Sequence, residues 1–132
     1  MVINRTTVFD YVYRKIKAQD ANISISAVPS NTPSSFPAVA MQEISAVENE
    51  NNVTFNNDDK QYISTFEVNV YTNKEGTGFT QGQELMDAIQ GYFKTLGYIM
   101  VMREPLANLD TTIYRFVARF RRTIGGGDTI SN

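Results

Sequence analysis

Cysteine and histidine are both absent from this chain of 132 residues. Without cysteine, the chain has neither a disulfide framework nor a thiolate site, and redox chemistry gives no indication of its compartment. Without histidine, it lacks the commonest general base and the commonest zinc ligand. Carboxylates, lysine, tyrosine and hydroxyl groups remain for catalysis. We therefore expect a protein that is not an enzyme and that uses no cofactor or metal.

A strong excess of charge of one sign is also missing. The chain has 12 basic and 14 acidic side chains, and 42% of its residues are hydrophobic. This balance is unlike that of a disordered acidic tail or a generic nucleic-acid binder. No apolar run approaches the ~20 residues of a membrane span, and the N-terminus lacks the pattern of a signal peptide. We expect a protein that is made and kept in the cytosol, without a membrane partner.

The stretch from Thr112 to Thr123 is the most informative part of the sequence. Side chains alternate between the two faces of a strand. One face of this stretch is apolar and aromatic, and consists of Tyr114, Phe116, Ala118 and Phe120. The opposite face consists of Arg115, Val117, Arg119 and Arg121. The first face is expected to pack on a core, and the second to meet solvent or a partner.

Hydrophobic periodicity and turn residues predict the other elements. The first helix begins at Asn4 or Thr7, which are equally plausible caps, and ends near Gln19. The second helix covers about 80–95 and is stopped by Gly97. The remaining predicted strands are 23–28, 36–44, 61–72 and 98–102.

This order of elements, α-β-β-β-α-β-β, predicts an α+β fold, a two-layer sandwich in which two helices pack on one face of an antiparallel sheet. We expect a single domain over 1–124 and a flexible tail over 125–132. The polar stretch 45–60 is predicted to be a mobile loop or a long hairpin tip. Val53 and Phe55 are apolar residues inside its most polar part, and they could order against a neighbouring subunit.

Motifs that carry chemistry are weak in this sequence. Gly76-Thr-Gly78 precedes a helix but lacks the lysine of a phosphate-binding loop. The run Asn56-Asn-Asp-Asp59 lacks the glycine and the distal glutamate of a calcium loop. The arginine-bearing face has three possible interpretations, namely a solvated surface, a contact with an acidic neighbour, and a contact with phosphates.

Four pieces of the sequence, in this order and spacing, resemble the tail terminator (tail completion) proteins of long-tailed bacteriophages and related prophage elements. They are Ser35-Phe-Pro37, Phe66-Glu-Val-Asn-Val-Tyr71, Leu96-Gly-Tyr98 and Asn108-Leu-Asp-Thr-Thr-Ile-Tyr-Arg115. The resemblance extends over nearly the whole chain, and none of the four pieces is a catalytic motif.

The resemblance implies a subunit of a hexameric ring at the head-proximal end of the tail tube. Such a ring would stop tail polymerisation and offer a docking surface to the head–tail connector protein. Its partners would be further copies of itself, the tail tube protein and the connector, and DNA would pass through it without sequence-specific binding. The implied location is the virion tail, assembled in the cytoplasm of the host bacterium.

Two other functions fit the same residues. A neck or head-completion protein would share the ring symmetry but assemble on the portal side. A single-stranded nucleic-acid binder would use aromatic and arginine side chains of one sheet as a stacking platform. Under the ring hypothesis, the subunit contact is expected to use Glu67, Arg115, Arg119, Arg121, Val53 and Phe55, with acidic partners among Glu43, Glu48, Glu50, Asp58 and Asp59.

Overall fold

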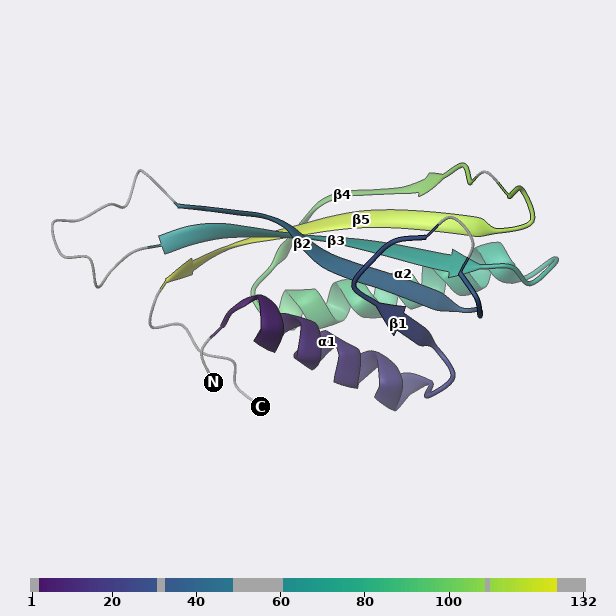
Figure 1. Ribbon diagram of the computed structural model, residues 1–132, viewed down its shortest axis with the longest axis horizontal. Coiled ribbons are helices and arrows are strands. Elements are labelled where there is room, and N and C mark those ends of the chain that lie inside the picture. Colours follow the sequence, from purple (N-terminus) through teal and green to yellow (C-terminus); the bar gives the residue numbers. More distant parts are fainter. Residues whose placement is uncertain (1–2, 31–32, 49–60, 109, 126–132) are drawn as a thin grey trace, which may run out of the picture.

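The computed structural model describes residues 3–30, 33–48, 61–108 and 110–125. The chain order of its elements is α1 (Arg5–Gln19), β1 (Ser24–Ser26), β2 (Ala38–Glu48), β3 (Gln61–Thr72), α2 (Gly78–Thr95), β4 (Ile99–Leu106) and β5 (Tyr114–Gly125). The strands form one sheet in the order β1-β2-β3-β5-β4. Both helices lie on the same face of this sheet (Figure 1). The predicted α+β fold of two layers is confirmed.

Local sequence sets the ends of the helices. Asn4 is the N-cap of α1, because its side chain accepts a hydrogen bond from the Thr7 amide at 2.9 Å and the Thr7 hydroxyl accepts one from the Asn4 amide at 2.9 Å. This reciprocal pair satisfies two amides that the first turn of a helix leaves unbonded. Gly97 follows α2 with a φ of +84°, a conformation that glycine adopts without a steric penalty. The predicted stop at Gly97 is confirmed.

The sheet is mixed, which corrects the prediction of a purely antiparallel one. The β2–β3, β3–β5 and β5–β4 pairs are antiparallel, and β3 and β5 pair along their whole length as expected. However, Ser24–Ser26 of β1 pairs with Ala38–Ala40 of β2 in parallel. The two strands can run in the same direction because the connection between them is long enough for the chain to return to the end of the sheet where β1 starts before β2 begins. Alternation within a short strand carries no information about the direction of its neighbour.

The core lies between the sheet and the helices. Phe66, Val68 and Val70 of β3 are fully buried there, beside Phe116 and Phe120 of β5. This confirms which faces of β3 and β5 were expected to be apolar. The helices contribute buried side chains at helical spacing, which are Val8, Tyr11, Val12, Ile16, Leu85, Met86, Ile89 and Phe93.

Two strands are longer than the sequence indicates. β2 continues through Glu48, so the first four residues of the loop expected over 45–60 are strand residues that pair with β3 beyond a bulge between Glu43 and Ser45. β4 continues to Leu106, although 104–110 was expected to be a turn-rich connection. Pro105 is tolerated there because β4 is an edge strand, whose outward amides need no partner strand. The rest of the loop, 49–60, and the tail after Gly125 lie outside the described residues.

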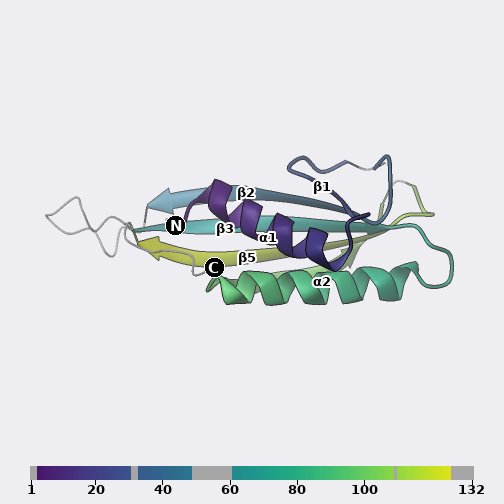
Figure 2. The same ribbon diagram turned by 90° about the horizontal axis from the view of Figure 1, so that it is seen from below.

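The face of the sheet opposite the helices is covered at one end, whereas the sequence predicted no cover. Ala38, Ala40, Tyr71 and Ile113 form a second buried cluster on this face, and Phe36 packs against it. The connection between β1 and β2 wraps around the β2 edge of the sheet to this side (Figures 1 and 2). At the other end, β2, β3 and β5 extend past both helices (Figure 2).

A close approach between α2 and β5 makes Gly82 sensitive to substitution. A Cβ atom at this position would lie 2.2 Å from Cε2 of Phe116, whose side chain is buried. We expect Gly82→Ala to destabilise the domain by about 1–2 kcal/mol, because overpacking outweighs the helix propensity of alanine. Urea unfolding monitored by circular dichroism measures the change.

Gly91 of the same helix supplies the matched control, because a Cβ atom there would meet nothing within 4 Å. Gly91→Ala is expected to stabilise the domain by about 0.5–1 kcal/mol through helix propensity alone. Equal effects of the two substitutions would contradict the packing of Phe116 against Gly82.

Candidate functional site

The candidate site is the arginine face, which we define as Glu67, Asn69, Tyr71, Arg115, Arg119 and Arg121 on the side of the sheet away from the helices. The register of β3 and β5 places Glu67 opposite Arg119, Tyr71 opposite Arg115 and Thr65 opposite Arg121. The structure thus brings Glu67 and the three arginines onto one surface, as the alternation predicts. The other two residues of the expected contact, Val53 and Phe55, lie outside the described residues.

Glu67 and Arg119 are partners within one subunit. Nε of Arg119 donates to Oε2 of Glu67 at 3.0 Å. The side-chain Nδ2 of Asn69 donates to the other carboxylate oxygen at 3.2 Å. The Glu67 side chain is 16% exposed and the Arg119 side chain 47%. An exposed pair of this kind contributes roughly 0–1 kcal/mol to stability. The pair therefore orients Arg119 on the surface more than it stabilises the fold.

Arg115 is also held by its own subunit. Its Nε donates to Oδ1 of Asn69 at 3.0 Å, and its guanidinium lies 5.6 Å from the centre of the Tyr71 ring. Asn69 and Tyr71 are both buried, each with 1% of its surface exposed. Burial raises the pKa of the Tyr71 hydroxyl, and the nearby Arg115 charge partly opposes that rise. Arg115 thus serves as part of the cover of this face.

Arg121 is an exposed cation of the arginine face. It lies between Thr65 of β3 and Ile99 of β4. Within the described residues, no salt bridge to Arg121 is formed. Arg122, the next residue, faces the helix side and donates to the Leu96 carbonyl at the end of α2. Of the arginines of β5, Arg121 is therefore the one best placed to reach a carboxylate or phosphate of another molecule.

The acidic residues expected as partners separate into two groups. Glu50, Asp58 and Asp59 lie outside the described residues. Glu43 and Glu48 lie on β2, and the Glu43 carboxylate accepts a hydrogen bond from the Ser64 hydroxyl at 2.7 Å on the helix side of the sheet. The arginine face and the acidic end of β2 are therefore different surfaces of one subunit.

Sequence reasoning did not anticipate the exposed apolar residues on β4. Ile99, Met100 and Val101 are consecutive and are 60%, 43% and 42% exposed. The run 98–102 is apolar, which fits a buried strand as well as an exposed edge strand. β4 is an edge strand because, among the strands of the sheet, it pairs only with β5. A buried partner strand on its other side would have hidden these side chains.

A hydrogen-bonded chain of side chains lies under the sheet, where Ser64 contacts both Glu43 and Tyr98. The hydroxyls of Ser64 and Tyr98 are 2.8 Å apart, and burial raises the pKa of Tyr98 from 10.0 to about 12. The folded state keeps the phenol of Tyr98 neutral. The stability linked to this raised pKa is therefore complete below pH 10 and is lost as the pH rises towards 12.

Between pH 10 and pH 12, the free energy of unfolding of the parent chain is expected to fall because Tyr98 ionises more easily in the unfolded state. We expect this fall to be smaller by about 2 kcal/mol in Tyr98→Phe. The phenylalanine ring keeps the packing but has no proton to release. Denaturant unfolding at a series of pH values measures the difference. Parallel curves for the two proteins would show that Tyr98 titrates alike in the folded and unfolded states.

The described part of the chain shows no candidate metal-binding cluster. It has no group of three or more acidic, histidine or cysteine side chains placed to hold a metal ion. At the turn before α2, the Gly78 amide already donates to the Lys74 carbonyl at 2.7 Å, which disfavours the phosphate-binding interpretation of Gly76-Thr-Gly78. No helix in the described residues is long and apolar enough to cross a membrane.

Comparisons with known proteins give similarity in fold. No protein-family model matches the chain, and no curated protein matches it by sequence. The fold is similar to that of a chain in the solved structure of the virion of a native gene transfer agent (GTA) particle. The two chains are 14% identical and superpose with a TM-score of 0.64, over 89% of this chain and 93% of the other. At this identity, the similarity establishes a shared fold over nearly the full length of both chains.

Proposed function

We propose that this chain is a structural protein of a phage or phage-like particle, and that it acts as the tail terminator. Six copies would form a ring at the head-proximal end of the tail tube, stop its polymerisation and present the surface that joins the tail to the head connector. The observation that carries the proposal is the near full-length likeness to a chain of a virion particle. The four terminator-like sequence pieces point to the same class of protein.

The ring hypothesis agrees with the layout of the surface. A closed ring needs two different surfaces on each subunit, one that fits the other on the next copy. The exposed cation Arg121 and the exposed apolar residues of β4 lie towards one edge of the sheet, and Glu43 and Glu48 lie on β2 at the other side. We propose that the ring acts as a scaffold and not as an enzyme, and that DNA passes through it without sequence-specific contacts.

A neck or head-completion role on the portal side is the second candidate. The comparison supports it as well, since the gene transfer agent structure is described as a whole virion. Nucleic-acid binding by stacking fits the structure less well. The aromatic rings of β5 face the core, and on the arginine face Tyr71 is buried under Arg115. A stacking platform requires exposed rings.

Size-exclusion chromatography with light scattering tests the assembly. We expect a particle of six times the 14.9 kDa mass of the chain. A gel-shift experiment with single-stranded DNA at low and moderate salt is expected to show no shift. A monomer that binds DNA in a salt-sensitive way would contradict the proposal and favour the nucleic-acid interpretation.

A further inference from the structure

We propose that neighbouring copies join their sheets edge to edge, with β4 of one subunit lying antiparallel to the open half of β2 of the next. This inference rests on the proposed ring and specifies the contact within it. Two open strand edges on opposite sides of one sheet, each with exposed apolar side chains, carry the argument. The occupant of each edge is therefore a second copy of this chain.

The first open edge is β4, the last strand of the sheet. Its amides and carbonyls on the side away from β5 have no partner strand in the described residues. Such an edge can pair with another chain unless charges, prolines or bulges prevent it. Arg103, Glu104 and Pro105 protect the second half of β4, whereas the first half exposes three consecutive apolar residues, Ile99–Val101.

The second open edge is the far half of β2. β1 pairs with β2 only at Ala38–Ala40, so among the described residues no strand pairs with β2 on that side from Met41 to Val47. This part of the strand exposes Ile44 by 40% and Val47 by 56%. It belongs to the part of the sheet that extends past the helices (Figure 2). A monomer rarely leaves two apolar edges exposed without a function for them.

The directions of the strands determine the geometry of the contact. Each of the pairs β2–β3, β3–β5 and β5–β4 is antiparallel, so β2 and β4 of one subunit run in opposite directions. In a head-to-tail contact, neighbouring copies keep nearly the same orientation. A β4 edge that meets the next β2 edge therefore pairs with it in antiparallel fashion, and the helix side of one sheet continues into the helix side of the next.

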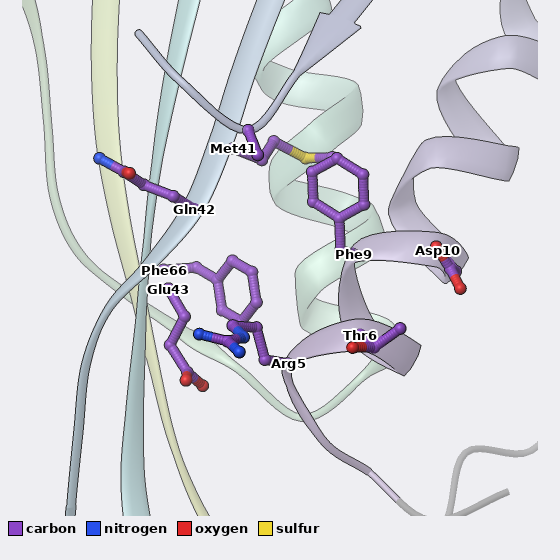
Figure 3. Close-up of a pocket in the computed structure, with 9 residues that line it drawn as sticks. Arg5, Thr6, Phe9, Asp10, Met41, Gln42, Glu43 and Phe66 are labelled. Atoms are coloured by element: carbon purple, nitrogen blue, oxygen red, sulfur yellow. The ribbon is translucent and has the colours of Figure 1, made fainter.

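A hollow lies beside β2, next to the part of its open edge that the later residues of the incoming strand would reach. It has a volume of about 390 Å³ and lies between α1 and the open edge of β2, with Phe9, Met41 and Phe66 as its apolar lining (Figure 3). Arg5 and Glu43 lie nearby on its two walls (Figure 3). The lining of the hollow thus combines apolar and polar side chains, as protein interfaces do.

Met100 of the neighbouring β4 lies opposite Ala46 when Ile99 lies opposite Val47, so it contacts the open edge of β2 beyond the hollow. Within its own subunit, Met100 lies opposite Phe120, so it is on the helix side of β4, and it is 43% exposed. Methionine is unbranched and adapts to irregular apolar space. Ile99 lies on the other side of β4, where it would meet Val47 of the next copy. Both apolar edges are then covered by the same contact.

Paired cysteines test the contact, because the natural chain has no cysteine. Ile99→Cys and Val47→Cys are introduced together, and the protein is treated with a mild oxidant, which joins cysteines in direct contact by a disulfide. Within one subunit these positions are separated by three strand spacings, about 14 Å, so a disulfide could not join them internally. We expect a ladder of covalent multimers in denaturing gels, and dimers at most from each single-cysteine variant.

The control pairs Ile99→Cys with Ala18→Cys, an exposed residue of α1, and is expected to give no ladder. A ring by light scattering without a ladder from the Ile99–Val47 pair would overturn the edge contact and leave the proposed ring standing. A ladder from a chain that elutes as a monomer would support the edge contact and contradict a stable free ring. A monomer without a ladder would overturn both.

Discussion

Replacing Phe93 by alanine is expected to destabilise the domain by about 4 kcal/mol, which is a large part of the roughly 5–15 kcal/mol that stabilises an ordinary domain. Phe93 is fully buried and joins three aromatic rings across the core. Its ring centre lies 4.6 Å from that of Phe120, 5.4 Å from that of Tyr98 and 5.6 Å from that of Phe66. Its removal leaves a cavity and also removes these ring contacts. Thermal and urea unfolding measure the loss.

Phe79→Ala is the matched control, since it makes the same change in the same helix. Phe79 is 44% exposed, although its ring lies 5.1 Å from that of Phe116. We expect a loss of roughly 1 kcal/mol from this variant. A Phe93→Ala protein whose melting temperature stays within a degree or two of the parent would show that α2 does not cover the sheet as described.

The double charge reversal Arg119→Glu with Arg121→Glu is expected to give a folded subunit that no longer forms rings. Arg121 is exposed at the β4 side of the sheet, and Arg119 keeps Glu67 neutralised on the same surface. The variant replaces two cations by carboxylates. Together with Glu67, these carboxylates form a group of three acidic side chains that would repel an acidic surface on the neighbouring subunit. Because the pair with Glu67 contributes little to stability, the fold is expected to survive.

Light scattering measures the loss of the ring, and circular dichroism must be native-like for the result to count. Arg14→Glu with Lys15→Glu is the control, because it makes the same change in charge on exposed positions of α1. We expect the control to assemble. Rings formed equally by both variants would remove the arginine face from the subunit contact.

Local patterns in the sequence were sufficient for most of the fold. The alternation of Phe66, Val68 and Val70 predicted β3 with its observed bounds and its buried face. The same rule separated the aromatic and arginine sides of β5. Gly97 marked the end of α2 because its φ is positive. In each case the deciding interactions lie within the element itself or in its immediate neighbour.

Features that depend on distant segments were the ones that the sequence did not reveal. The parallel direction of β1 depends on where β2 begins, and the burial of Tyr71 depends on the connection that wraps over it. The polar composition around Glu48 suggested a loop, but pairing with β3 extends the strand. The exposed edge at Ile99 follows from strand order, to which an apolar run gives no clue.

Tail length is the measurement that tests the proposed function most directly. The coding sequence of this chain is deleted from the phage or prophage that carries it, and tails in the lysate are measured by electron microscopy. We predict headless tails whose tubes exceed the parent length, with normal length restored when the chain is supplied in trans. Tails of normal length in the deletion would contradict a terminator, and if these tails lacked heads, the result would favour the neck or head-completion role.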